Sequence, residues 1–280
     1  MCALATHGRG ALALASQTCD EAPQRHLIVC QELSSSRRST VFQAVDPVFQ
    51  RHVALKTATQ ETHRTAELIV REAEILSSLE HPNIARLIGL DYAKRSAALL
   101  TEFVSGSTLD SQLAYGFNRT TPQIVELIIQ LCQAVSAVHR AGFVHGDISS
   151  RNVLIAPDNR VVLIDFGESR PLDAPRTAAR ATPAFAAPEL IHGAPAGILS
   201  DIYSLGVLVS LLVRGETVKH PSPTAFHAPE AVALSDELRW PLLDIIERAT
   251  ESDPSRRYAT VEEVLSAVQQ LAAAPTEPTT

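Results

Sequence analysis

Polar residues of types that can handle charge at a reaction centre occur in two short segments of the sequence. Asp147 and Asn152 lie in the run His-Gly-Asp-Ile-Ser-Ser-Arg-Asn-Val-Leu, and Asp165 opens the tripeptide Asp-Phe-Gly after an apolar run. Both segments are predicted to be short loops at strand edges. Upstream, Lys56 ends an apolar strand and Glu72 lies on the helix that follows. A lysine at a strand end is ordinarily solvated, so only the order and spacing of all five residues favour a shared catalytic role.

The two loops resemble the catalytic loop and the metal-binding loop of the protein kinase family. Phosphoryl transfer requires a protein chiefly to position ATP and to neutralise the charge that develops on the γ-phosphate. The resemblance implies that Lys56 holds the α- and β-phosphates of ATP and that Glu72 holds Lys56. It also implies that Asn152 and Asp165 ligate Mg²⁺, and that Asp147 orients the acceptor hydroxyl and takes its proton. The implied reaction transfers the γ-phosphate of ATP to Ser or Thr hydroxyls of a protein substrate.

Further matches to the family extend along the chain. They include His-Pro-Asn-Ile before a predicted strand, and the run Thr-Pro-Ala-Phe-Ala-Ala-Pro-Glu that begins at Thr182 and ends at Glu189. By resemblance, Glu189 pairs with Arg257, and Asp201 braces the catalytic loop from a buried helix. These residues are predicted to have structural rather than catalytic roles.

The resemblance also implies an adenine site between two lobes. Apolar side chains would lie above and below the base, and backbone groups of Glu102 and Val104 would hydrogen-bond its edge. The predicted nucleotide-binding residues are Leu33, Ser34, Ser36, Ser39, Val41, Ala54, Lys56, Glu102, Val104, Leu154 and Asp165.

The loop that would cover the phosphates departs from the family pattern, because Ser34, Ser36 and Ser39 stand where the family has glycines. Glycine takes positive φ and lets the backbone approach a phosphate, so each serine is predicted to cost on the order of 1 kcal/mol of strain. Alternatively, the hydroxyls, Arg37 or Arg38 donate to phosphate. The departure keeps open a catalytically weak pseudokinase scaffold as an alternative function.

The catalytic loop departs from the family pattern as well. Gly146 replaces the usual arginine, Ser149 replaces the lysine typical of serine/threonine kinases, and Arg151 occupies a position that is arginine in many tyrosine kinases. His145 is predicted to pack against Phe166 rather than to act as a base. The tripeptide His-Gly-Asp also resembles small-molecule phosphotransferases such as aminoglycoside and choline kinases. The segment 182–189 nevertheless favours a protein kinase of the serine/threonine type.

The order of predicted elements indicates an α+β, two-lobed fold, with a small β-rich lobe (about 27–104) before a larger α-helical lobe (about 105–273). Together they form a predicted kinase domain at 27–273, with disordered segments at 1–26 and 274–280. Strands are expected at 26–33, 41–45, 52–57, 84–91 and 97–103, helices at 62–79, from 121 onward, and near 200–214, 235–251 and 260–273, and a loop at 215–234.

Composition limits the remaining classes of function. A formal charge of −7 over 280 residues argues against a nucleic-acid partner held by a basic surface. The four cysteines lack CxxC spacing, which favours reduced thiols and a cytoplasmic location. The longest strongly apolar run, 205–213, is too short to span a bilayer, so no membrane span is predicted. An unrecognised export signal in the first residues is the alternative to a cytoplasmic location, and the sequence does not indicate an oligomeric state.

Overall fold

A computed structural model describes residues 11–13, 26–60, 62–93, 96–174, 181–214 and 236–273. The described residues divide into two compact units. The first contains the chain up to Glu80 together with Ala85–Val104, and the second contains His81–Ile84 and the chain from Ser105 onward. The predicted disordered ends, apart from 11–13 and 26, and the predicted loop at 215–234 lie outside the described residues. The domain limits of 27–273 stay a prediction.

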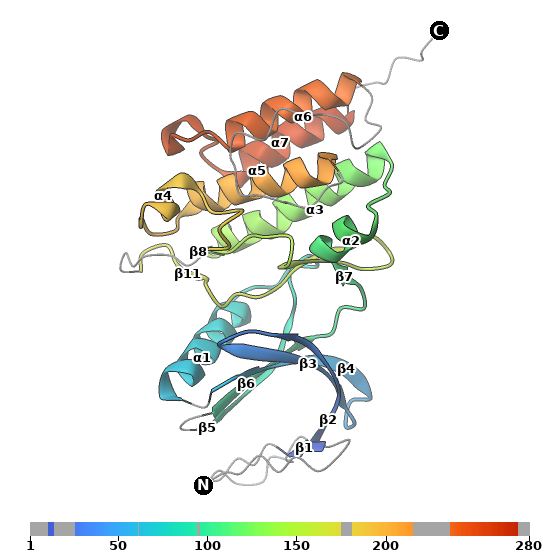
Figure 1. The fold of residues 1–280 in the computed structure, drawn as a ribbon, viewed down its shortest axis with the longest axis vertical. Coiled ribbons are helices and arrows are strands. Elements are labelled where there is room, and N and C mark those ends of the chain that lie inside the picture. Colours follow the sequence, from blue (N-terminus) through green and yellow to red (C-terminus); the bar gives the residue numbers. More distant parts are fainter. Residues whose placement is uncertain are drawn as a thin grey trace. The chain divides into compact units, whose positions relative to one another are not determined.

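The first unit is an antiparallel sheet with one helix packed against it (Figure 1). The strand order is β1-β2-β3-β4-β6-β5, and helix α1 (His63–Ser77) contacts β4, β5 and β6. Within the segment 1–26, which was predicted to be disordered, Ala11–Ala13 pair with β2 as an edge strand. The strands are β1 (Ala11–Ala13), β2 (His26–Ser35), β3 (Ser39–Asp46), β4 (Arg51–Ala58), β5 (Leu87–Ala93) and β6 (Ser96–Glu102).

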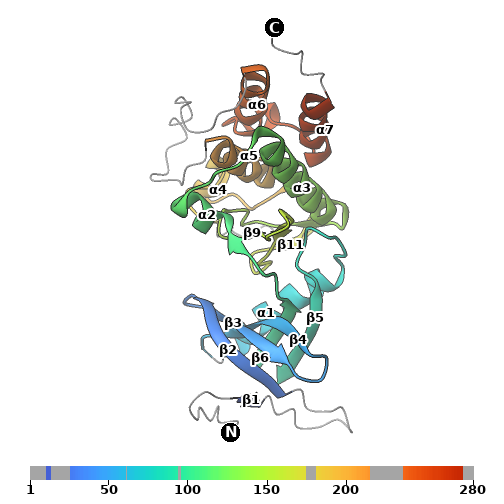
Figure 2. The same ribbon diagram turned by 90° about the vertical axis from the view of Figure 1, so that its right-hand side faces the viewer.

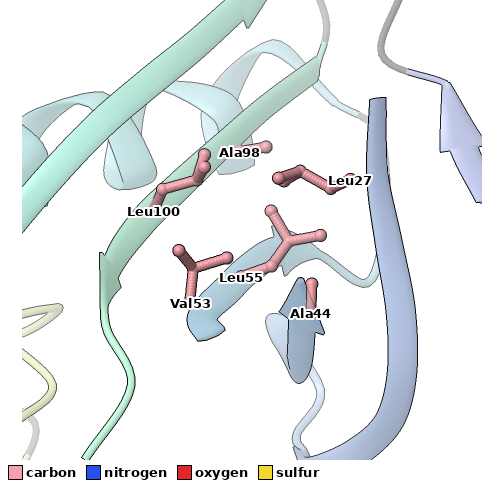
Figure 3. Packing of buried hydrophobic residues seen from close by; sticks show 6 residues of the cluster. All are labelled: Leu27, Ala44, Val53, Leu55, Ala98 and Leu100. Atoms are coloured by element: carbon pink, nitrogen blue, oxygen red, sulfur yellow. The ribbon is translucent and has the colours of Figure 1, made fainter. Parts of the chain in front are cut away.

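Alternation along β4 separates the core of this unit from its polar residues. Val53 and Leu55 are fully buried, whereas Ala54 and Lys56 point to the opposite face because successive strand residues alternate. Burying each aliphatic side chain of this size contributes on the order of 2 kcal/mol. Figure 3 shows the cluster, to which four strands contribute: Leu27, Ala44, Val53, Leu55, Ala98 and Leu100.

Helix α1 presents Glu72 from its buried face. Thr62 caps the helix, since its side chain accepts a hydrogen bond from the amide of Thr65 at 3.2 Å. The buried positions Ala66, Ile69 and Ala73 recur at helical spacing, and Glu72 lies among them. The helix therefore anchors its apolar stripe on the sheet and fixes the direction of this carboxylate.

The second unit is mainly helical (Figure 2). Helix α3 (Thr121–Arg140) contacts α5 (Ile198–Arg214) and α7 (Val261–Ala273), and α6 (Asp236–Ala249) contacts α5 and α7. The shorter elements include a 3-10 helix at Pro254–Arg256, α2 (Leu109–Tyr115), α4 (Pro188–Ile191), and strands β7 (Ser107–Thr108), β8 (Phe143–Val144), β9 (Val153–Ile155), β10 (Val161–Leu163) and β11 (Arg170–Pro171).

Some predicted boundaries are wrong by a few residues. Helix α3 begins at Thr121 as predicted, and its N-cap is Thr120, whose amide donates to the side-chain oxygen of Gln123 at 2.9 Å. The predicted strand at 84–91 begins at Leu87 instead, and Ile84 forms an isolated bridge with Leu163 in the second unit. Apolar periodicity continues through such junctions, so it cannot locate them.

Helix α3 is long and apolar enough, by length and composition, to cross a membrane. More than half of its apolar window is buried within the protein, and the helix contacts α5, α7 and β10. A core helix of a soluble domain passes the same length and composition test, so this helix is weak evidence for a membrane span.

Candidate active site

Lys56 and Glu72 form a close ion pair in the first unit. The ammonium Nζ lies 2.8 Å from Oε1 and 2.6 Å from Oε2 of the carboxylate. The two side chains are only 13% and 4% exposed. A desolvated pair of this kind is weak evidence for stability, because the attraction must offset the cost of removing both charges from water. Its geometry does fix the position of a lysine ammonium beside the sheet.

Four of the predicted nucleotide residues of the first unit share one face of the sheet: Ser34, Val41, Ala54 and Lys56. Val41 is the direct cross-strand partner of Ser34 on one side and of Lys56 on the other. Directly paired residues project to the same face, and Ala54 joins them because it is two positions from Lys56. Glu102 ends β6, where its amide donates to the carbonyl of Arg86 at 2.9 Å. The sheet register therefore brings the side chains of Ser34, Val41 and Lys56 into one row, whereas Glu102 pairs with Val53 and projects to the other face.

In the second unit, the carboxylate of Asp147 is held by three hydrogen bonds. Its Oδ1 accepts from the amide and the hydroxyl of Thr182, both at 2.7 Å. Its Oδ2 accepts from Nδ2 of Asn152 at 3.1 Å, and the same nitrogen donates to the Asp147 carbonyl at 2.8 Å. All these donors are uncharged, so they orient the carboxylate without adding a compensating charge beside it.

Asn152 and Asp165 are brought together by the backbone, because the amide of Ile164 donates to the carbonyl of Asn152 at 2.9 Å. Asp165 is exposed and has a φ of 60°, a conformation that non-glycine residues rarely adopt. Since Nδ2 of Asn152 is used by Asp147, its Oδ1 is the atom left for a cation. An amide oxygen and a carboxylate are hard ligands that fit Mg²⁺, which takes few protein ligands and keeps several waters.

Asp201 braces the start of the catalytic loop from helix α5. Its Oδ2 accepts from Nε2 of His139 and from the amide of His145, both at 2.8 Å, and its Oδ1 accepts from the amide of Gly146 at 2.9 Å. Burial raises the pKa of Asp201, but the His139 hydrogen bond and the nearby imidazoles outweigh this effect and hold the pKa below its usual value. The predicted packing of His145 on Phe166 is confirmed, with ring centroids 4.8 Å apart.

The lowered pKa of Asp201 predicts a specific acid sensitivity. The carboxylate stabilises the fold fully above its unfolded-state pKa, and this stabilisation is lost as the pH falls through the lower, folded-state pKa. We expect Asp201→Asn to cost about 2 kcal/mol at neutral pH, because an amide nitrogen would meet a backbone donor. Thermal unfolding between pH 7 and pH 3 should show the parent and the variant converging as the pH falls. A difference in Tm that stays constant across this range would refute the assignment.

The predicted backbone strain in the serine-rich loop is wrong. None of Ser34, Ser36 and Ser39 has a positive φ. The hairpin tip is instead closed by Ser36, whose Oγ accepts from the amides of Arg38 at 3.2 Å and Ser39 at 3.1 Å and donates to the Ser39 carbonyl at 3.0 Å. Thr59, which follows the last residue of β4, holds the tip: its amide donates to the Arg38 carbonyl and its hydroxyl donates to the Ser36 carbonyl, each at 2.9 Å.

The loop therefore uses the Ser36 side chain where other hairpins use glycine conformations. We expect Ser36→Gly to free the amides of Arg38 and Ser39 and to raise the flexibility of the tip. Hydrogen exchange at these two amides should become several-fold faster, while Ser34→Gly, which removes no hydrogen bond of the tip, serves as the matched control. Unchanged exchange in Ser36→Gly would show that the side chain does not hold the loop.

The geometry at Gly146 explains why no arginine stands there. Its φ is 80°, and a Cβ added at this position would lie 2.8 Å from the carbonyl oxygen of Glu168. Any side chain would therefore strain both backbone and packing. Ser149, at the position of the usual lysine, is only 1% exposed and is not available to a substrate.

The implied pairing of Glu189 with Arg257 is confirmed. Nη1 and Nη2 of Arg257 donate to the two oxygens of Glu189 at 2.7 and 2.8 Å. This bidentate pair ties α4 to the segment before α7, and it makes no contact that would assign it a catalytic role.

Sequence reasoning missed two contacts that shape this site. Thr182 lies 35 positions from Asp147 in the chain and was predicted only as part of a motif. Ser150 donates to Asp110 of α2 at 2.7 Å, and the amide of Asp110 donates back to the Ser150 carbonyl at 3.0 Å. Both are tertiary contacts between segments whose own patterns give no sign of the pairing.

The structure thus assembles a β-rich unit carrying a lysine–glutamate pair and a helical unit carrying an aspartate, an asparagine and a second aspartate on adjoining loops. This is the two-lobed α+β fold of protein kinases. A family model described as the protein kinase domain matches residues 29–268. The chain therefore belongs to the protein kinase family.

Relatives in bacteria are named as serine/threonine-protein kinases. The serine/threonine-protein kinase pkn2 of Myxococcus xanthus is 30% identical over 263 residues, covering 86% of this chain and 32% of that protein. The serine/threonine-protein kinase PknJ of Mycobacterium tuberculosis is 30% identical, covering 82% of this chain and 43% of that protein. The serine/threonine-protein kinase PknA of Mycobacterium tuberculosis is 34% identical, covering 63% and 44%. The chain spans less than half the length of these relatives.

Proposed function

We propose that this chain is an ATP-dependent protein kinase that transfers the γ-phosphate of ATP to Ser or Thr hydroxyls of a protein substrate. The single observation that carries the proposal is the held carboxylate of Asp147, oriented by Thr182 and by Asn152. The names of the relatives support serine and threonine as acceptors.

In the proposed reaction, Asp147 accepts the proton of the acceptor hydroxyl while the acceptor oxygen bonds to the γ-phosphorus and the bond to the leaving ADP oxygen breaks. Lys56, fixed by Glu72, binds the α- and β-phosphates. Asn152 and Asp165 would hold Mg²⁺, which would supply charge neutralisation at the phosphates. Glu72 acts through Lys56, because it fixes the position of the lysine ammonium.

We propose that the shared sheet face of Val41 and Ala54, with Leu33 and the serine-rich loop, binds the nucleotide together with Leu154. The amide of Glu102 already donates to Arg86, so an adenine edge would use the Glu102 carbonyl and the backbone of Val104. The hydroxyl of Ser36 already donates to the Ser39 carbonyl inside the hairpin. Contact between this loop and phosphate would therefore come from backbone amides, from the hydroxyls of Ser34 and Ser39, or from arginine side chains rather than from the Ser36 hydroxyl.

A cytoplasmic location is part of the proposal. It is supported by Cys30 and Cys132, which are free thiols. Burial raises the pKa of the Cys132 thiol to about 12, so this group stays protonated and unreactive at neutral pH.

Radiolabelled ATP with Mg²⁺, offered in parallel with generic protein acceptors and with small hydroxylated compounds, tests the function directly when phospho-residue analysis follows. We expect label on serine and threonine. Label transferred only to small hydroxylated compounds would indicate a small-molecule phosphotransferase. A thermal shift with Mg-ATP but no turnover would indicate a non-catalytic scaffold.

A further inference from the structure

The second unit carries a pocket that none of the proposed catalytic residues lines. It lies over α2 and the loop from α2 to α3, with a volume of about 490 Å³. Figure 2 shows α2 beside β9. The residues that line the pocket include Ser107, Gln112, Tyr115, Phe117 and Arg119. The volume is within the range of ligand pockets, roughly 300 to 1,000 Å³.

The charge of Arg119 in this pocket is not balanced by a carboxylate among the described residues. Its Nη1 donates to the side-chain oxygen of Asn159, and its Nη2 donates to that of Gln112 at 2.9 Å. Both acceptors are neutral amides. A guanidinium has five N–H donors in a fixed fork, so these two bonds hold the group in place and leave donors for a ligand.

Aromatic surface lies next to this cation. Tyr115 is 92% exposed, and the guanidinium of Arg119 lies 5.9 Å from the ring centroid of Phe117. An exposed tyrosine beside a fixed arginine is the combination that is enriched where protein segments bind. The pocket therefore offers an anion contact and an apolar contact side by side.

The pocket is also connected to the catalytic loop through α2. Asp110, in the first turn of α2, exchanges two hydrogen bonds with Ser150, at 2.7 and 3.0 Å. Ser150 lies three residues after Asp147 in the same loop. A segment bound against α2 would therefore be held on an element that is fixed to the loop carrying the proposed base.

We infer that this pocket docks an acidic segment of the protein substrate, with a carboxylate on Arg119 and an adjacent apolar side chain against Tyr115. Local charge complementarity favours this occupant, because the guanidinium of Arg119 is held by two neutral amide oxygens and keeps N–H donors for a carboxylate. That the docked segment belongs to a substrate rests on the proposed function, whereas docking itself requires no catalysis.

Fluorescence anisotropy with a labelled short peptide of alternating Asp and Leu tests docking without ATP. We expect salt-sensitive binding that Arg119→Gln weakens by at least about tenfold, with Arg119→Lys intermediate because it keeps the charge but loses the fork. Tyr115→Ala should also weaken binding, and being exposed it should leave the Tm unchanged. Arg64→Gln, which removes an exposed arginine on α1, is the matched charge control and should bind like the parent. Equal peptide affinity of the folded parent and the folded Arg119→Gln variant would overturn the inference. So would equal affinity of the parent for the Asp-Leu peptide and for a peptide in which every Asp is replaced by Asn.

A second readout separates docking from catalysis. When the acidic segment is appended to an acceptor peptide, Arg119→Gln should raise KM roughly tenfold and leave kcat unchanged, and it should not affect the same acceptor without the segment. A fall in kcat for both peptides would overturn the docking role. Peptide binding without any phosphorylation would instead refute the proposed function and leave docking intact.

Discussion

Asp165→Ala should lower phosphotransfer by at least about a thousandfold, roughly 4 kcal/mol of transition-state stabilisation, and leave the Tm nearly unchanged. The side chain is exposed, and its carboxylate accepts from the amide of Gly167 at 3.2 Å, a bond of little weight for the fold. The proposed role toward Mg²⁺ would be lost completely. Initial rates at saturating ATP, together with thermal unfolding, measure both effects.

Asp173→Ala is the matched control, because it removes an exposed aspartate from the same stretch of chain. We expect parental activity from this variant. Turnover of Asp165→Ala within about tenfold of the parent, a barrier change of only about 1.4 kcal/mol, would remove Asp165 from the catalytic set.

Lys56→Met should abolish turnover to a similar extent but also lower stability, since it leaves the 4% exposed Glu72 without its lysine. The double variant Lys56→Met with Glu72→Leu separates the two effects. We expect it to regain the parental Tm and to remain inactive. Activity in the double variant would show that neither residue binds the nucleotide.

The sheet and its site face follow closely from the sequence. Alternation in β4 predicts which side chains are buried, and the cross-strand register then places Ser34, Val41 and Lys56 in one row. The pairing of Lys56 with Glu72 was predicted from resemblance to a family, because nothing local links a strand end to a helix position 16 residues away. Long-range contacts of this kind depend on the whole fold.

The conformation of the serine-rich loop could not be derived from residue types. Serine at a glycine position predicts strain only if the backbone keeps the glycine conformation. Here Ser36 closes the hairpin with its own side chain, and Thr59 fixes the hairpin through two further hydrogen bonds, so the backbone adopts another path.

The short helix α2 was missed because its seven residues carry too little periodicity to be distinguished from a loop.

Arg257→Ala should destabilise the second unit by about 3 to 5 kcal/mol, because it leaves Glu189 without its charge partner and opens a buried space. The Arg257 side chain is 0% exposed, and besides both oxygens of Glu189 it donates to the carbonyls of Glu251 and Leu199, each at 2.7 Å. A loss of this size corresponds to a fall in Tm of roughly 10 °C for a chain of this length.

Arg256→Ala is the control for Arg257→Ala, since Arg256 is exposed and its replacement should change the free energy of unfolding by no more than about 0.5 kcal/mol. Glu189→Gln tests the pair from the other side: it keeps the shape of the carboxylate and removes its charge, so it should be destabilising as well, by less than Arg257→Ala. If the Tm of Arg257→Ala lay within a degree or two of that of Arg256→Ala, the ion pair would contribute nothing beyond an exposed contact, and the bracing of α4 would have to come from its apolar residues alone.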